Sequence, residues 1–107
     1  MIKVEIKQNQ DYLIALKISG HAESGEYGHD LVCAGVSASA VGILNMLAEM
    51  GFLKRQLGTL EMDNGHVNIV VKQYDHDCQV VLETLVVILK TMVASYGQYI
   101  KISIVEV

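Results

Sequence analysis

Two cysteines and four histidines are the side chains in this sequence best suited to nucleophilic or metal chemistry. Cys33 stands out, because Asp30 is placed to cap a helix whose first turn would then contain Cys33. The N-terminus of a helix carries partial positive charge, which favours a thiolate over a thiol. That interaction is worth about 0.3–1 kcal/mol, and one pKa unit corresponds to about 1.4 kcal/mol, so the helix alone activates the sulfur only weakly.

A thiolate that is strongly nucleophilic at neutral pH therefore needs a cationic neighbour, and His21 is the candidate. Cys–His pairs activate the nucleophile of thiol proteases. In that role His21 would accept the Cys33 proton and later protonate the leaving amine. The backbone N–H groups around Cys33 and Ala34 would hold the oxyanion, since a helix leaves its first N–H groups without intrahelical partners. Asp30 keeps two open roles, as the helix cap or as the third member of a triad.

Other interpretations fit the same residues. Free cysteine is often buried, and the residue pattern alone favours a Cys33 that is merely packed in the core. The main rival to an enzyme is then a non-enzymatic, dimeric module that binds a protein tail or assists ribosome assembly. A redox disulfide with Cys78 is a third possibility, although Cys-x-x-Cys is absent. His76 and Cys78, two residues apart near a helix start, would point to different sides, so we expect no metal or other cofactor. We expect His29 and His66 at the surface.

Apolar and polar residues alternate with a period of two in several runs, which predicts strands. The first two runs flank the polar turn Gln8–Asp11 and predict a hairpin. Four residues of its second strand are expected on one face: Tyr12, Ile14, Leu16 and Ile18. Asp63-Asn64-Gly65 is a strong turn signal for a second hairpin. The expected strands are 2–7, 12–19, 57–62, 66–71 and 100–104.

The longest uncharged stretch, residues 31–48, predicts a helix that begins after Asp30 and ends at Gly51. It reaches the lower length limit for a membrane span, but its polar residues and glycines favour a buried helix over a membrane segment. Gly42 inside it indicates close packing against a neighbour, because glycine otherwise costs helix stability. Since the helix is apolar nearly all round, we expect it inside the fold or against a second subunit.

A second helix is expected to begin after Asp75 or Asp77, to run to about Tyr96 and to end at Gly97. The element order is then β-β-α-β-β-α-β. This order predicts an α+β fold in which two helices pack on a mainly antiparallel sheet. The length of 107 residues fits one domain, residues 1–107.

Composition excludes several function classes. The net charge is −4 and Lys54-Arg55 is the only adjacent basic pair, so direct binding to nucleic acid is not expected. Two cysteines are too few for a disulfide-rich secreted fold, and the alternating N-terminus does not resemble a signal peptide. We therefore expect free thiols in a cytoplasmic protein.

Two motifs carry a family resemblance: Gly-His-Ala at 20–22, and Glu-Tyr-Gly-His-Asp-Leu-Val-Cys-Ala-Gly-Val-Ser-Ala at 26–38. Together they resemble the signature of the bacterial ribosomal-processing cysteine proteases, the Prp family. The element order and the second hairpin are also similar to that family.

The resemblance implies a cytoplasmic cysteine endopeptidase that works as a homodimer. It further implies a substrate, the precursor of a large-subunit ribosomal protein, from which a short N-terminal extension is removed. The family's nucleophile falls on Cys33 and its general base on His21.

The segment between these two residues, 22–29, is rich in glycine and predicts a loop that covers the cleft and orders on substrate binding. Glu23, Glu26 and Asp30 give the region negative charge. Because ribosomal proteins are typically basic, this charge would attract the precursor.

Overall fold

The computed structural model describes residues 1–20, 30–63 and 65–107. Within them the elements follow the predicted order, with bounds that differ by a few residues from those expected. In chain order they are β1 (Ile2–Asn9), β2 (Tyr12–Ser19), α1 (Leu31–Glu49), β3 (Gly58–Asp63), β4 (His66–Val71), α2 (His76–Tyr96) and β5 (Ile100–Glu106).

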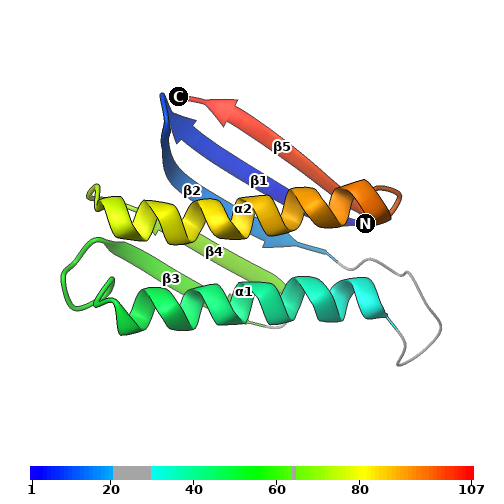
Figure 1. The fold of residues 1–107 in the computed structure, drawn as a ribbon, viewed down its shortest axis with the longest axis horizontal. Coiled ribbons are helices and arrows are strands. Elements are labelled where there is room, and N and C mark those ends of the chain that lie inside the picture. Colours follow the sequence, from blue (N-terminus) through cyan, green and yellow to red (C-terminus); the bar gives the residue numbers. More distant parts are fainter. Residues whose placement is uncertain (21–29, 64) are drawn as a thin grey trace.

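The described strands form one sheet in the order β3-β4-β2-β1-β5 (Figure 1). The pairs β1–β2, β2–β4 and β3–β4 are antiparallel. β5 instead pairs in parallel with β1, so the sheet is mixed but mainly antiparallel. The predicted α+β class, with two helices on such a sheet, is confirmed.

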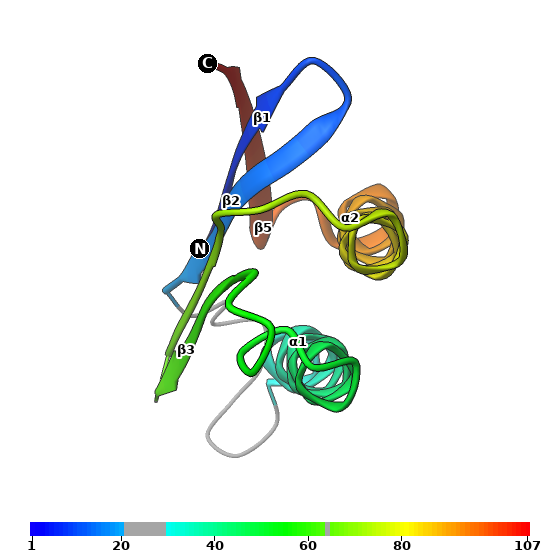
Figure 2. The same cartoon turned by 90° about the vertical axis from the view of Figure 1, so that its left-hand side faces the viewer.

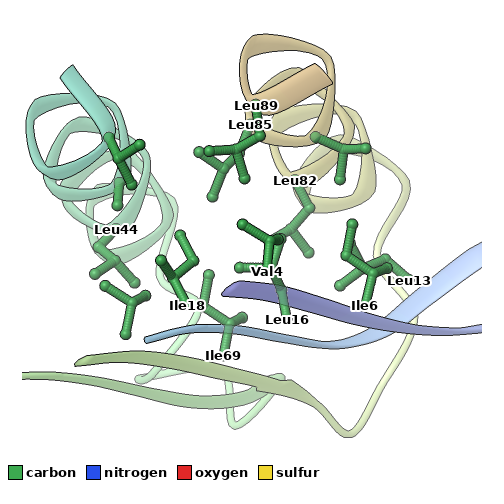
Figure 3. Close-up of a cluster of buried hydrophobic side chains, with 14 of the residues drawn as sticks. Val4, Ile6, Leu13, Leu16, Ile18, Leu44, Ile69, Leu82, Leu85 and Leu89 are labelled. Atoms are coloured by element: carbon green, nitrogen blue, oxygen red, sulfur yellow. The ribbon is translucent and has the colours of Figure 1, made fainter. Parts of the chain in front are cut away.

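Both helices cover the same face of the sheet, which gives two layers (Figure 2). They lie side by side and run in opposite directions, so that their N-termini are at opposite ends of the molecule (Figure 1). The core between the layers consists mainly of Val, Ile and Leu side chains from strands and helices (Figure 3). Burial of this apolar surface is the main favourable contribution to folding.

One strand face differs from the prediction. The pairing of β1 with β2 shifts register between Lys7 and Gln8: Lys7 lies opposite Ala15, whereas Gln8 lies opposite Leu13. Ile14 is therefore the extra residue of a bulge, and such an insertion reverses the alternation of side chains beyond it. Leu13 is buried in place of Ile14, and Tyr12 is exposed.

The ends of both helices were predicted well. α1 begins after Asp30 and has Met50 as its C-cap, followed by Gly51 with a φ of +82°. For α2, Asp75 rather than Asp77 is the N-cap. The expectation that Gly42 marks close packing is wrong, because a Cβ there would meet no described atom within 4 Å.

α1 is not enclosed by the described part of the fold. Its buried residues recur every three or four positions and form one stripe on the sheet: Val32, Val36, Ala40, Leu44 and Leu47. The opposite side carries exposed apolar residues, among them Leu31 (80%) and Met46 (46%). The expectation that α1 lies inside the fold is therefore wrong. The alternative, that α1 contacts a second subunit, stays a prediction.

Both helices are long and apolar enough to cross a membrane, judged by length and composition alone. In the structure each instead buries one stripe against the sheet. The core helices of soluble proteins commonly pass the same length and composition test.

Candidate active site

The first turn of α1 holds the candidate nucleophile. The Asp30 carboxylate caps the helix, with its Oδ1 atom 2.9 Å from the backbone nitrogen of Cys33, which donates the hydrogen bond. The predicted cap is thus confirmed, and Cys33 lies in the turn where the partial positive charge of the helix is greatest. No acidic residue follows Asp30 in the first turn to offset that charge.

Cys33 is half-buried and lines a pocket of about 220 Å³. α1 contributes Ala34 and Ser37 to the same pocket, and the hairpin between β3 and β4 contributes Met62 and Asp63. The sulfur therefore borders a pocket large enough for substrate atoms. Cys33 also packs against the hydrophobic core, but because it borders this pocket it is not enclosed in a dry, closed hydrocarbon environment, which would have favoured a purely structural role.

Gly20, at the end of the described part of β2, lines the same pocket. It has a φ of +88°, a conformation that glycine adopts far more readily than other residues. A Cβ at this position would collide with the carbonyl oxygen of Met1. His21 is bonded directly to Gly20, so the chain reaches His21 from the wall of the pocket. His21 itself, and the 22–29 loop with its predicted gating role, lie outside the described residues.

The two described histidines are not placed to activate Cys33. His66 is exposed as predicted and lines the same pocket as Cys33 at the start of β4. Because the next residue, Val67, is buried towards the helices, the alternation of the strand directs the His66 side chain to the other face of the sheet. His76 begins α2, far from the N-terminus of α1 (Figure 1). Its side chain is 75% exposed and lies 3.3 Å from the Asp77 carboxylate.

Two of the backbone groups predicted as oxyanion donors already have partners, so which first-turn N–H groups hold the oxyanion stays a prediction. The N–H of Cys33 is taken by Asp30 Oδ1, and the N–H of Ala34 donates to the Asp30 carbonyl oxygen, with a nitrogen–oxygen distance of 3.1 Å. The cap prediction already implied the first of these bonds, because an N-cap side chain accepts from the second or third residue of the helix. Within the described part of the chain, the N–H groups of Leu31 and Val32 make no hydrogen bond.

Sequence reasoning missed several pocket residues. Ser37 could have been found, since residues four apart share a helix face and Ser37 follows Cys33 at that spacing. Met62 and Asp63 could not, because their position beside α1 depends on the order of strands in the sheet.

Cys78 is a contrasting thiol at the N-terminus of α2. It is buried, and desolvation raises the pKa of its thiol to about 11, with a further contribution from the Asp75 carboxylate. The cap bond from the Cys78 N–H, together with the Arg55 guanidinium, lowers the pKa of Asp75. Cys33 and Cys78 form no disulfide within the described part of the chain. His76 is exposed where Cys78 is buried, so the two do not share one site.

Comparison with known proteins gives consistent matches along the chain. The sequence profile of the family described as "Cysteine protease Prp" matches residues 1–101. The ribosomal processing cysteine protease Prp of Staphylococcus aureus strain Mu50 is 35% identical over 107 residues, which cover 96% of this chain and 98% of that protein.

Two crystal structures of the S. aureus protease are also similar. The complex with a covalently linked product peptide has a TM-score of 0.80 at 30% identity, over 97% of this chain and 99% of that one. The complex with a substrate peptide has a TM-score of 0.74 at 29% identity, with the same coverage.

Proposed function

The chain belongs to the cysteine protease Prp family, and from that membership we propose that it is an endopeptidase whose nucleophile is Cys33 and whose general base is His21. The proposal assigns a Cys–His dyad. Asp30 serves as the helix cap that fixes the first turn around the nucleophile.

One observation carries the proposal: Cys33 lies in the first turn of α1 and shares a pocket with Gly20, the residue bonded to His21. The partial charge of the helix N-terminus and a neighbouring imidazolium both stabilise a thiolate. Cys78 is buried and its pKa is raised to about 11, so it is not a competing nucleophile. Of the two described histidines, His76 begins the other helix, and His66 lines the pocket from a strand position whose side chain faces away from α1.

The reaction follows from these positions. His21 takes the thiol proton, and the Cys33 sulfur attacks the scissile carbonyl carbon to form a tetrahedral intermediate. The intermediate collapses, the carbon–nitrogen bond breaks, and His21 protonates the leaving amine. A water molecule, deprotonated by the neutral imidazole, then hydrolyses the thioester and regenerates the thiol.

We assign the substrate by analogy with the S. aureus relative, which is named a ribosomal processing protease and has been crystallised with substrate and product peptides. The proposed substrate is the precursor of a large-subunit ribosomal protein that carries an N-terminal extension, cleaved in the cytoplasm. We also propose a homodimer, supported by the exposed apolar side of α1. The acidic segment around 23–30 would attract the basic precursor.

The experiment is processing of the extended precursor, with the new N-terminus mapped by mass spectrometry. Cys33→Ala and His21→Ala should lower kcat/KM by about 10³-fold or more, because a nucleophile and its base act as a unit. Cys78→Ala is the matched control and should process the precursor normally. Full activity of Cys33→Ala would refute the protease mechanism and favour the non-enzymatic module.

A further inference from the structure

The structure leaves the oxyanion of the proposed reaction without the donors that a helical nucleophile usually supplies. The backbone N–H of Cys33 is occupied by the Asp30 side chain, and that of Ala34 by the Asp30 carbonyl. Cysteine and serine hydrolases need donors aimed at the oxygen that becomes negative in the transition state. A side chain bordering the same pocket can supply a donor in place of these two N–H groups.

Ser37 lies in the right place. It follows Cys33 by four residues on α1, which puts the two Cβ atoms about 5–6 Å apart on one face of the helix. Side chains of a helix lean towards its N-terminus, so the Ser37 hydroxyl leans over the turn that holds Cys33. Both residues line the same pocket, and Ser37 is exposed to it. A carbonyl group bonded to the Cys33 sulfur fits within this spacing.

The Ser37 hydroxyl is also free to donate. Serine and threonine within helices often donate to the carbonyl four residues earlier. Ser39, Thr84 and Thr91 all do so here, each with an oxygen–oxygen distance of 2.8 Å. Ser37 makes no such bond, and among the residues that the structure describes it has no hydrogen-bond partner.

The other described polar side chains of the pocket are poor candidates. Asp63 lies directly opposite His66, so the two side chains share one face of the sheet, and a carboxylate would in any case repel an oxyanion. The ring of His66 belongs to the far face of the sheet. Resting on the proposed function, we infer that the Ser37 hydroxyl is an oxyanion donor for peptide cleavage by Cys33.

In the reaction, the Cys33 sulfur bonds to the carbonyl carbon and the π electrons of the carbonyl move to its oxygen. The Ser37 O–H donates a hydrogen bond to that oxygen and keeps its own proton. On collapse the electron pair returns to form the thioester carbonyl, and the amine leaves with a proton from His21. Ser37 thus stabilises charge without taking part in proton transfer.

The test compares Ser37→Ala with Ser39→Ala, a control on the same helix whose hydroxyl is bound to the Gly35 carbonyl. Loss of an oxyanion donor lowers kcat by about 10²–10³-fold, so Ser37→Ala should show that fall with KM nearly unchanged. Ser39→Ala should keep wild-type kcat. Ser37→Thr retains a hydroxyl and should recover much of the lost rate.

A second measurement shows whether Ser37 stabilises charge in the transition state or instead activates the Cys33 sulfur. Alkylation of Cys33 by iodoacetamide forms no oxyanion, so Ser37→Ala should react at the wild-type rate across the pH range. A peptide aldehyde adds to the sulfur and forms an oxyanion-like adduct, so its inhibition constant should rise in the same variant. Equal melting temperatures of the variants exclude misfolding as the cause.

Three results would overturn the inference: unchanged kcat in Ser37→Ala, a rise in KM alone, or an equal fall in alkylation and hydrolysis. The first shows that Ser37 is dispensable, the second assigns it to substrate binding, and the third assigns it to thiolate formation. None of these results affects the proposed protease mechanism itself, which the activity of Cys33→Ala tests separately.

Discussion

The Asp30 carboxylate and the Cys33 backbone are joined by a 2.9 Å hydrogen bond, so the residue that starts α1 also fixes the turn that carries the sulfur. A capping carboxylate satisfies an N–H that would otherwise lack a partner. The consequence for catalysis is that this N–H is not available to substrate.

The cap role of Asp30 predicts different outcomes for two substitutions. Asn is as good an N-cap as Asp, so Asp30→Asn should keep both the fold and most of the activity, whereas Asp30→Ala should lose about 1 kcal/mol of stability. Thermal unfolding and precursor cleavage measured side by side check this. A folded Asp30→Asn variant with kcat reduced by orders of magnitude would show instead that Asp30 is a member of a triad.

Gly20 and Gly42 form a matched pair of glycine positions. Gly20→Ala should lower both stability and activity, because a left-handed conformation costs a non-glycine residue about 1–2 kcal/mol and the Cβ meets the Met1 carbonyl. Gly42→Ala meets open space in a helix and should raise stability by about 1 kcal/mol with activity unchanged. The melting temperature and the kcat/KM of each variant test these two expectations. A fully active, stable Gly20→Ala would remove the argument that this glycine positions His21.

The two thiols should differ in reactivity. At pH 7 iodoacetamide should label Cys33 in the native protein and leave Cys78 untouched, since burial raises the pKa of Cys78 to about 11 and only the thiolate reacts. Peptide mapping after labelling identifies the modified residue. Cys78 should become reactive on denaturation. Preferential labelling of Cys78 in the folded protein would contradict the assignment of roles.

Asp75 should make stability depend on pH. Its pKa is lowered in the folded state by the cap bond from Cys78 and by Arg55, so its stabilising effect is present above the unfolded pKa. The effect is lost as the pH falls through the folded pKa. Asp75→Asn keeps a capping group without the charge, so its deficit in melting temperature should be clear at pH 7 and should shrink at pH 3. A deficit in melting temperature that is equal at pH 7 and pH 3 would show that the charge of Asp75 does not contribute to stability.

Much of the fold could be predicted because its signals are local. Alternation of apolar residues, a turn triplet and two capping aspartates define the elements and their order. The order of strands could not be predicted, because β1 pairs in parallel with β5 across most of the chain length. The bulge at Ile14 was missed for a similar reason, since it is defined only by the pairing partner of β2.

The candidate site likewise combines features that follow from local sequence with features that depend on the arrangement of the sheet. The position of Cys33 in a first turn follows from Asp30, three residues earlier, and was predicted correctly. The approach of Gly20 to the same pocket depends on the sheet, and no local pattern indicates it. The sequence could not show which first-turn N–H groups are available to an oxyanion, because a capping side chain and an oxyanion compete for the same N–H groups.

The most direct test of the central claim is to look for the acyl-enzyme. The protein is mixed with the extended precursor, quenched in acid within one turnover, and analysed by intact-protein and peptide mass spectrometry. The account predicts a mass increase equal to the N-terminal fragment less one water, located on Cys33, and no cleavage by Cys33→Ala. An adduct on another residue, or cleavage by Cys33→Ala at the wild-type rate, would contradict it.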